Sequence, residues 1–96
     1  MHPAYKIWRG ALWAIMWDVY ILKSLRDHGF YIGSTSNIER RLNKHNAGGV
    51  ISTKNRRPLE LIYKEEYIGK REASDREKAI KSYKGGQAFK RLINIA

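Results

Sequence analysis

Residues 17–33, Trp-Asp-Val-Tyr-Ile-Leu-Lys-Ser-Leu-Arg-Asp-His-Gly-Phe-Tyr-Ile-Gly, decide the fold that we predict for this chain. Two runs rich in β-branched and aromatic residues, 19–22 and 30–32, flank a polar segment that ends in Asp27-His28-Gly29. Such runs favour strands, and Asp and Gly supply the backbone freedom that a tight reversal needs. The stretch therefore predicts a β-hairpin.

Side chains alternate between the two faces of a strand, so the hairpin predicts which residues lie together. Tyr20 points to one face, and its neighbours Val19 and Ile21 point to the other. A turn centred between residues 25 and 26 would place Tyr20 directly opposite Tyr31, although a one-residue slip would exchange the faces. Two adjacent phenols are either core aromatics with satisfied hydroxyls or part of a site. Residues further along the chain bear on that choice.

The composition indicates one basic domain. A chain of 96 residues has the size of a single domain, and without cysteine it has neither disulfides nor thiolate metal sites. This fits a reducing compartment, so we expect a cytoplasmic protein. The 19 Lys and Arg against 9 Asp and Glu give a net charge of +10, a field that attracts polyanions. Nucleic-acid enzymes, ribosomal proteins and membrane-surface proteins share this balance, so it indicates a class of partner and no reaction.

Residues 1–16 differ from the rest and are interpreted as an N-terminal extension, with the domain at 17–96. Their apolar run, 11–17, is far shorter than the ~20 residues that span a bilayer. A signal peptide is the alternative, but no small-x-small cleavage site follows the run. A translation start at Met16 is a further hypothesis, which mass spectrometry of the native protein would test.

A polar loop, 33–37, leads into a predicted helix over 37–46. Ser36 and Glu39 have the spacing of a capping box, in which each side chain bonds a free amide of the first turn. Gly48 is a plausible stop signal.

One face of this helix carries Ile38, Arg41, Leu42 and His45, at i, i+3, i+4 and i+7. A half-buried arginine needs an anion, because an unpaired charge out of water is costly. For Arg41 the anion is either a structural carboxylate or a substrate phosphate, which suits the planar guanidinium fork. His45 taken alone is typical of a satisfied core or rim histidine.

The helix and the loop that follows it, 47–58, are strongly basic. Residues 39–57 carry six Lys and Arg against one Glu. Basic and short hydroxyl side chains suit a phosphate backbone, which fixes position without reading sequence. A solvated charged face is the alternative, and it stays open for the pair at 56–57. The candidate nucleic-acid contacts are Arg40, Lys44, Ser52, Thr53, Lys54, Arg56 and Arg57.

The second half of the chain predicts a third strand over 59–65, a helix over 70–83 and a last helix over 87–95. Glu77 shares the inward stripe of the first of these helices with Ala73, Arg76 and Ile80. A carboxylate in that position takes up a proton unless a basic side chain or a metal ion balances it.

Two tyrosines, an arginine, a histidine and a glutamate thus lie on inward or rim positions of separate elements. Hydrolysis of a phosphodiester needs a base for water, charge neutralisation at phosphorus and a hard cation. These side chains could supply all three in an α+β layer pair. A nucleic-acid-binding module without turnover and a basic structural protein, such as a ribosomal component, are the alternatives.

Several motifs together resemble the GIY-YIG nuclease domain, in particular its small single-domain bacterial (excinuclease-like) members. They are Asp18-Val19-Tyr20, Tyr31-Ile32-Gly33, the run 38–45 and the run 76–81. The resemblance covers 17 to about 93. It implies a three-stranded antiparallel sheet flanked by helices and an endonuclease that uses one divalent metal ion, Mg²⁺ or Mn²⁺.

The resemblance also implies roles for five residues. Tyr20 would be the general base for water, and Tyr31 would shape the site. Arg41 would hold the scissile phosphate, His45 would assist proton transfer, and Glu77 would be the metal ligand. A free phenol titrates near ~10, so a tyrosine base at neutral pH needs its pKa lowered by up to about 3 units, roughly 4 kcal/mol.

Two positions depart from the family pattern. Asp18 replaces the glycine of the first half-motif, and the later asparagine is assigned neither to Gln87 nor to Asn94. The expected partner is DNA, in repair or recombination, with specificity from the domain itself, an oligomer or a protein partner. No membrane and no small-molecule cofactor are expected.

Overall fold

The computed structural model describes residues 16–94. The predicted extension therefore lies outside the described residues, except for Met16, which begins the first strand. Among the described residues no helix is both long and apolar enough to cross a membrane. The elements are β1 (Met16–Ser24), β2 (Phe30–Thr35), α2 (Ile38–Asn46), the 3₁₀ turn η2 (Lys54–Arg56), β3 (Leu59–Ile68), α3 (Lys70–Ser82) and α4 (Gln87–Asn94).

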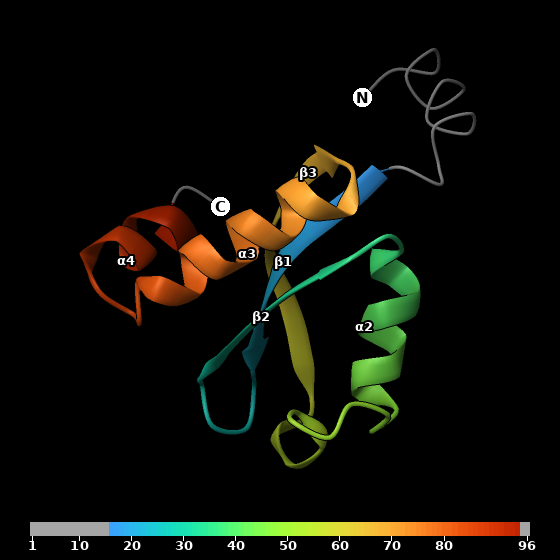
Figure 1. Ribbon diagram of the computed structural model, residues 1–96. Helices are drawn as coiled ribbons and strands as arrows, with labels where there is room; N and C mark the ends of the chain where they lie inside the picture. Colours follow the sequence, from blue (N-terminus) through green and yellow to red (C-terminus); the bar gives the residue numbers. More distant parts are fainter. Residues whose placement is uncertain (1–15, 95–96) are drawn as a thin grey trace.

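The three strands form one antiparallel sheet in the order β2-β1-β3, and helices flank it. The predicted α+β class is confirmed. Strand β1 takes the central position because its residues 19–22 are apolar on both faces, and all four are fully buried. Figure 1 shows α2 on one side of this sheet and α3 on the other.

The register of the β1–β2 hairpin differs from the predicted one. Tyr20 pairs with Gly33, and Leu22 pairs with Tyr31, so the two tyrosines are diagonal rather than directly opposite. The turn is centred one residue later than expected, which shifts the partner by two and leaves the faces unchanged. The predicted loop at 33–37 is also wrong in part, because Gly33 to Thr35 continue β2.

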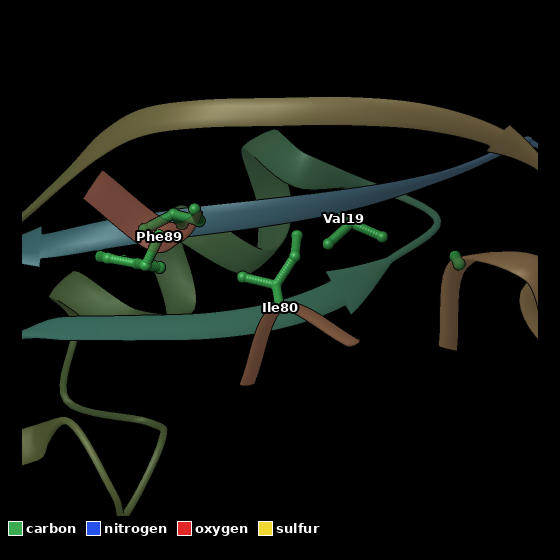
Figure 2. Close-up of a cluster of buried hydrophobic side chains, with 5 residues drawn as sticks. Val19, Ile80 and Phe89 are labelled. Atoms are coloured by element: carbon green, nitrogen blue, oxygen red, sulfur yellow. The ribbon is translucent and has the colours of Figure 1, made fainter. Parts of the chain in front are cut away.

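Two hydrophobic clusters lie on opposite faces of the sheet, as the alternation along β1 predicts. Val19 and Ile21 pack with Ala73 and Ile80 of α3 and with Phe89 of α4. Figure 2 shows this cluster, in which Ile80 and Phe89 point at the strand that carries Val19. Burying a side chain such as Ile80 contributes about 1.5–3 kcal/mol, so these contacts fix α3 to the sheet. On the other face, Tyr20 and Leu22 pack with Leu59 of β3 and with Ile38 and Leu42 of α2.

Helix α2 begins one residue later than predicted, and its cap is Asn37 rather than Ser36. The Asn37 side chain accepts a hydrogen bond from the Arg40 amide at 3.0 Å. The Thr35 hydroxyl in turn accepts the Asn37 amide at 3.1 Å, which places Asn37 at the extended backbone position of a cap. The predicted capping box of Ser36 and Glu39 is therefore wrong.

A hydrogen-bonded cluster joins α3 to the outer strand β3. The Glu65 carboxylate accepts the hydroxyls of Tyr63 and Tyr67, and Arg76 donates Nε to it at 2.8 Å and Nη2 at 3.0 Å. Burial acts to raise the pKa of Glu65, but these donors overcome it and lower the pKa to about 2. Arg76, predicted on the inward stripe, thus has a structural carboxylate as its partner.

Candidate active site

Tyr20 lies fully buried in the middle of the sheet, with its ring against the backbone of the neighbouring strand. A Cβ atom at Gly33 would lie 2.5 Å from the Tyr20 hydroxyl oxygen and 2.7 Å from Cζ. Only glycine therefore leaves room for this ring, because such distances are well inside van der Waals contact. The glycine of the Tyr-Ile-Gly motif places the phenol.

A buried chain of hydrogen bonds runs from Tyr20 into the basic loop. The Tyr20 hydroxyl lies 3.1 Å from Nε2 of His45, and Nδ1 of His45 lies 2.7 Å from the Thr53 hydroxyl. That hydroxyl donates to the Val50 carbonyl oxygen at 3.4 Å. The three side chains are fully buried, so each polar group depends on the others.

The end of this chain assigns the proton positions. Because the Thr53 hydroxyl donates to Val50, it accepts a proton from Nδ1–H of His45. Nε2 is then the bare nitrogen, and the Tyr20 hydroxyl donates to it. Burial, followed by the charges of Arg41 and Lys44, lowers the pKa of His45 from 6.5, so its imidazole is neutral at pH 7 and can accept a further proton.

The environment of Tyr20 opposes its ionisation. Burial, followed by the neighbouring Tyr31, raises the pKa of Tyr20 to about 12; the positive charge of Arg41 acts to lower it, and the negative charge of Glu77 acts to raise it. The predicted lowering of this pKa is therefore wrong for the protein without bound ligands. A neutral phenol at pH 7 can still pass its proton to His45 if it receives another one.

Tyr31 encloses the Tyr20–His45 pair from the side. Its ring centroid lies 6.3 Å from that of Tyr20 and 4.9 Å from that of His45, the latter in an edge-to-face arrangement. Edge-to-face contacts of this kind stabilise ring positions by about 0.5–1.5 kcal/mol. Tyr31 thus occupies a position from which it can shape the site.

Arg41 lies on the same face of α2 as His45 and opens onto a cavity of about 290 Å³ at the start of that helix. The cavity is lined by Thr35, Ser36, Asn37, Arg40, Arg41 and Lys44. Three basic side chains and the positive end of the helix dipole make it suited to an anion such as phosphate. Two of the predicted nucleic-acid contacts, Arg40 and Lys44, are thus brought beside Arg41.

Glu77 reaches strand β2 from the opposite side of the sheet. Its Oε1 accepts the Ser34 hydroxyl at 2.7 Å, and its Oε2 accepts Nζ of Lys81 at 2.6 Å. Ser34 follows Gly33, against which the Tyr20 ring lies, so the phenol and the carboxylate approach adjacent residues of one edge strand. This proximity agrees with the effect of the Glu77 charge on the Tyr20 pKa.

The Glu77 carboxylate also fits a hard divalent ion. It already balances one cation, the Lys81 ammonium, and the neighbouring Ser34 hydroxyl is a second oxygen donor. Mg²⁺ is commonly held by one or two carboxylates with water completing its shell. Within residues 16–94 no group of three or more His, Cys, Asp or Glu could hold an ion, so a site here would depend on one carboxylate.

The five predicted catalytic residues are thus gathered around the start of α2 and the edge strand β2, but not in one open pocket. Tyr20 and His45 are fully buried, and the cavity beside Arg41 includes neither Tyr20 nor Glu77. Residue types and spacing gave no sign of Ser34 or Lys81 as partners of Glu77, because both contacts depend on how α3 docks on the sheet.

The structure corrects one predicted nucleic-acid contact and separates the others. Thr53 is fully buried with its hydroxyl on His45, so it supports the site from within and is not exposed to a phosphate. Ser52 is exposed at the tip of the loop. Arg56 forms an ion pair with Asp27 at 2.9 Å, whereas Lys54 and Arg57 line a second cavity.

An α+β domain with a tyrosine–histidine pair, an arginine and a partly buried glutamate at one sheet edge has the side chains of a phosphodiester-cleaving site. The family model described as the GIY-YIG catalytic domain matches residues 16–90, and the chain belongs to this family of nuclease domains. The resemblance stated from the sequence is confirmed.

The similar proteins include several UPF0213 proteins. One of Staphylococcus haemolyticus is 44% identical over 75 residues, covering 77% of this chain and 90% of that protein. One of Clostridium perfringens is 47% identical over 64 residues, covering 66% of this chain and 68% of that protein. The solution NMR structure of the UPF0213 protein BH0048 from Bacillus halodurans is similar with a TM-score of 0.54 and 29% identity, covering 84% of this chain and 85% of that chain.

Proposed function

We propose that this protein is a divalent-metal-dependent endonuclease that hydrolyses DNA phosphodiester bonds. The observation that carries the proposal is the hydrogen bond from Tyr20 to the neutral His45, with Arg41 and Glu77 acting on the same phenol from two sides. A core that needed only to be filled would not require four polar side chains, since burying polar groups costs free energy unless every one is satisfied.

The phenol and the imidazole act as one proton acceptor. The attacking water gives a proton to the Tyr20 oxygen while the Tyr20 proton moves to Nε2 of His45, so a free tyrosinate is never formed. This answers the raised pKa of Tyr20, because the group that finally gains the proton is a histidine that is neutral at pH 7.

Arg41 and the start of α2 bind the phosphate. As the water oxygen bonds to phosphorus, the bond from phosphorus to the 3′ oxygen breaks, and that oxygen leaves with a proton from solvent. The products are a 5′-phosphate and a 3′-hydroxyl. A Mg²⁺ or Mn²⁺ ion held by Glu77 would offset charge on the phosphate and the Glu77 charge that raises the Tyr20 pKa.

The full burial of Tyr20 favours a second candidate function. In a DNA-binding module of the same fold, the Tyr20–His45 pair would be part of the core and only the basic surfaces would act. The net charge of +10 serves either function, so the phenol decides between them.

Cleavage of duplex, single-stranded and branched DNA with Mg²⁺ or Mn²⁺ tests the proposal. Tyr20→Phe and Glu77→Gln should lose cleavage, at least 100-fold for Tyr20→Phe because proton transfer contributes about 10²–10⁴-fold. Tyr63→Phe is the matched control, since Tyr63 carries a phenol on the opposite face of the sheet and should retain cleavage. Both phenylalanine variants should bind DNA as the wild type does.

Equal residual cleavage in all the proteins would point to a contaminant, and binding without cleavage in the wild type would support the binding module. For the biological setting we propose DNA repair or recombination in the cytoplasm, where a basic nuclease domain without cysteine can meet DNA in a reducing compartment.

A further inference from the structure

A second basic cavity lies at the other end of α2, away from the cavity beside Arg41. It measures about 400 Å³ and is lined by Arg26, Asn46, Lys54, Asn55, Arg57 and Pro58. Arg26 comes from the β1–β2 turn and the other residues from the end of α2 and the loop after it. Figure 1 shows this turn and this loop together at the lower end of the sheet.

Backbone contacts hold both guanidinium groups of this cavity in place. Arg26 donates Nη1 to the Asn55 carbonyl oxygen at 3.1 Å, and Arg57 donates Nε to that of Lys54 at 2.9 Å. Each arginine keeps further N–H groups for a ligand. Because these side chains are already ordered, binding a ligand loses less conformational entropy than binding by mobile arginines.

The wall of the cavity is also built in. Asn46 donates Nδ2 to the Leu59 carbonyl oxygen at 3.0 Å, and its Oδ1 accepts the Leu59 amide at 2.8 Å. This pair of bonds joins the end of α2 to the start of β3. The cavity therefore does not depend on a loose loop.

The charges of the cavity are not balanced from within the part of the chain that the structure describes. Arg26, Lys54 and Arg57 form no ion pair among residues 16–94, and the nearby Asp27 is paired with Arg56 at 2.9 Å. The C-terminal end of α2 contributes only about half a negative charge. Three cations outweigh it, so the cavity favours an anion.

The geometry points to a second phosphate subsite, which binds the backbone of the DNA strand away from the cleaved bond. The assignment of DNA rests on the proposed function, whereas the preference for a phosphate rests on the cavity itself. Helix α2 has 9 residues and is about 13 Å long, so the two cavities are separated by about four base-pair steps of ~3.4 Å. Two subsites at the ends of one rigid helix would fix the angle and position of the DNA backbone on the protein.

The first test measures DNA binding against salt concentration, with a duplex of about 20 base pairs and EDTA in place of the metal ion. Loss of one phosphate contact reduces the slope of log Kobs against log[salt] by about 0.9. Arg57→Gln should show this reduction and bind about three- to tenfold more weakly near 0.15 M salt, and Arg57→Lys should recover most of the slope because it keeps the charge.

Arg56→Gln is the matched control. It removes the same formal charge from the next residue, but from a side chain that already pairs with Asp27. Its change in slope should be less than half that of Arg57→Gln. Thermal unfolding of each variant shows that it is folded before its slope is compared.

The second test locates the contact by replacing single phosphates of the duplex with neutral methylphosphonates. The wild type should lose affinity at a linkage about four steps from the one that Arg41 contacts, and Arg57→Gln should be insensitive there. Equal slopes for Arg57→Gln and wild type, or equal losses for Arg56→Gln and Arg57→Gln, would overturn the subsite. A normal Arg57 effect in a protein that never cleaves DNA would leave the subsite standing and remove the nuclease.

Discussion

Gly33→Ala tests the position of the central phenol in the simplest way. The new Cβ would lie 2.5 Å from the hydroxyl oxygen of Tyr20 and 2.7 Å from Cζ. Tyr20 is fully buried between two strands and α2, so its ring cannot swing into solvent to relieve the clash. Overpacking a core in this way costs about 1–3 kcal/mol, and any shift of the ring also strains the bond to His45.

Urea or thermal denaturation measures this cost. A loss of 1 kcal/mol lowers the Tm of a domain of this size by roughly 4–8 °C, so Gly33→Ala should lower it by about 4–20 °C. A double-mutant cycle with Tyr20→Leu isolates the clash, because alanine at position 33 should be tolerated once the ring is gone. A full-sized loss that persists beside Tyr20→Leu would refute the reasoning, as would a Gly33→Ala protein with unchanged stability.

Three other contacts of the site can be tested in the same way. Thr53→Val should destabilise the fold by about 1–3 kcal/mol in urea unfolding, because Nδ1–H of the buried His45 loses its acceptor; equal stability would contradict the assigned proton positions. Stability should be complete above pH 6.5 and fall below it with a slope of up to ~1.4 kcal/mol per pH unit, because the pKa of His45 is lowered on folding and the unfolded chain binds the extra proton; pH-dependent unfolding of the wild type against His45→Asn checks the sign. Lys81→Met should lower the concentration of Mn²⁺ that half-saturates Glu77, read by paramagnetic resonance, because the ion no longer competes with an ammonium 2.6 Å from the carboxylate; a weaker site would contradict this.

The separation of the two sheet faces could be predicted from local sequence alone. A strand alternates by geometry, so Val19 and Ile21 had to face away from Tyr20, and the structure places them in separate clusters. The same holds for His45 and Arg41, which one helical face brings together. In each case a short repeat determines the outcome.

The hairpin register and the helix cap could not be predicted as securely. The turn residues allow more than one centre, and the observed one pairs Tyr20 with Gly33. Ser36 and Asn37 are both good caps, and the choice of Asn37 depends on a hydrogen bond from its amide to Thr35. Small local differences in free energy decide such alternatives.

The least predictable part of the site is its interior. Thr53 has the residue type of a surface contact, yet the loop folds back and buries it against His45. The raised pKa of Tyr20 likewise arises from burial by elements distant in the chain. Both depend on tertiary packing, which no local pattern of residues encodes.

The pH dependence of DNA cleavage tests the central claim most directly. If Tyr20 passes its proton to His45, kcat/KM should rise to a plateau with an apparent pKa below 6.5, because the ionisation of the lowered histidine controls it. A phenolate base with the Tyr20 pKa near 12 would instead make log kcat/KM climb steadily with pH well beyond neutrality. That steady climb, or the absence of cleavage at every pH, would contradict the account.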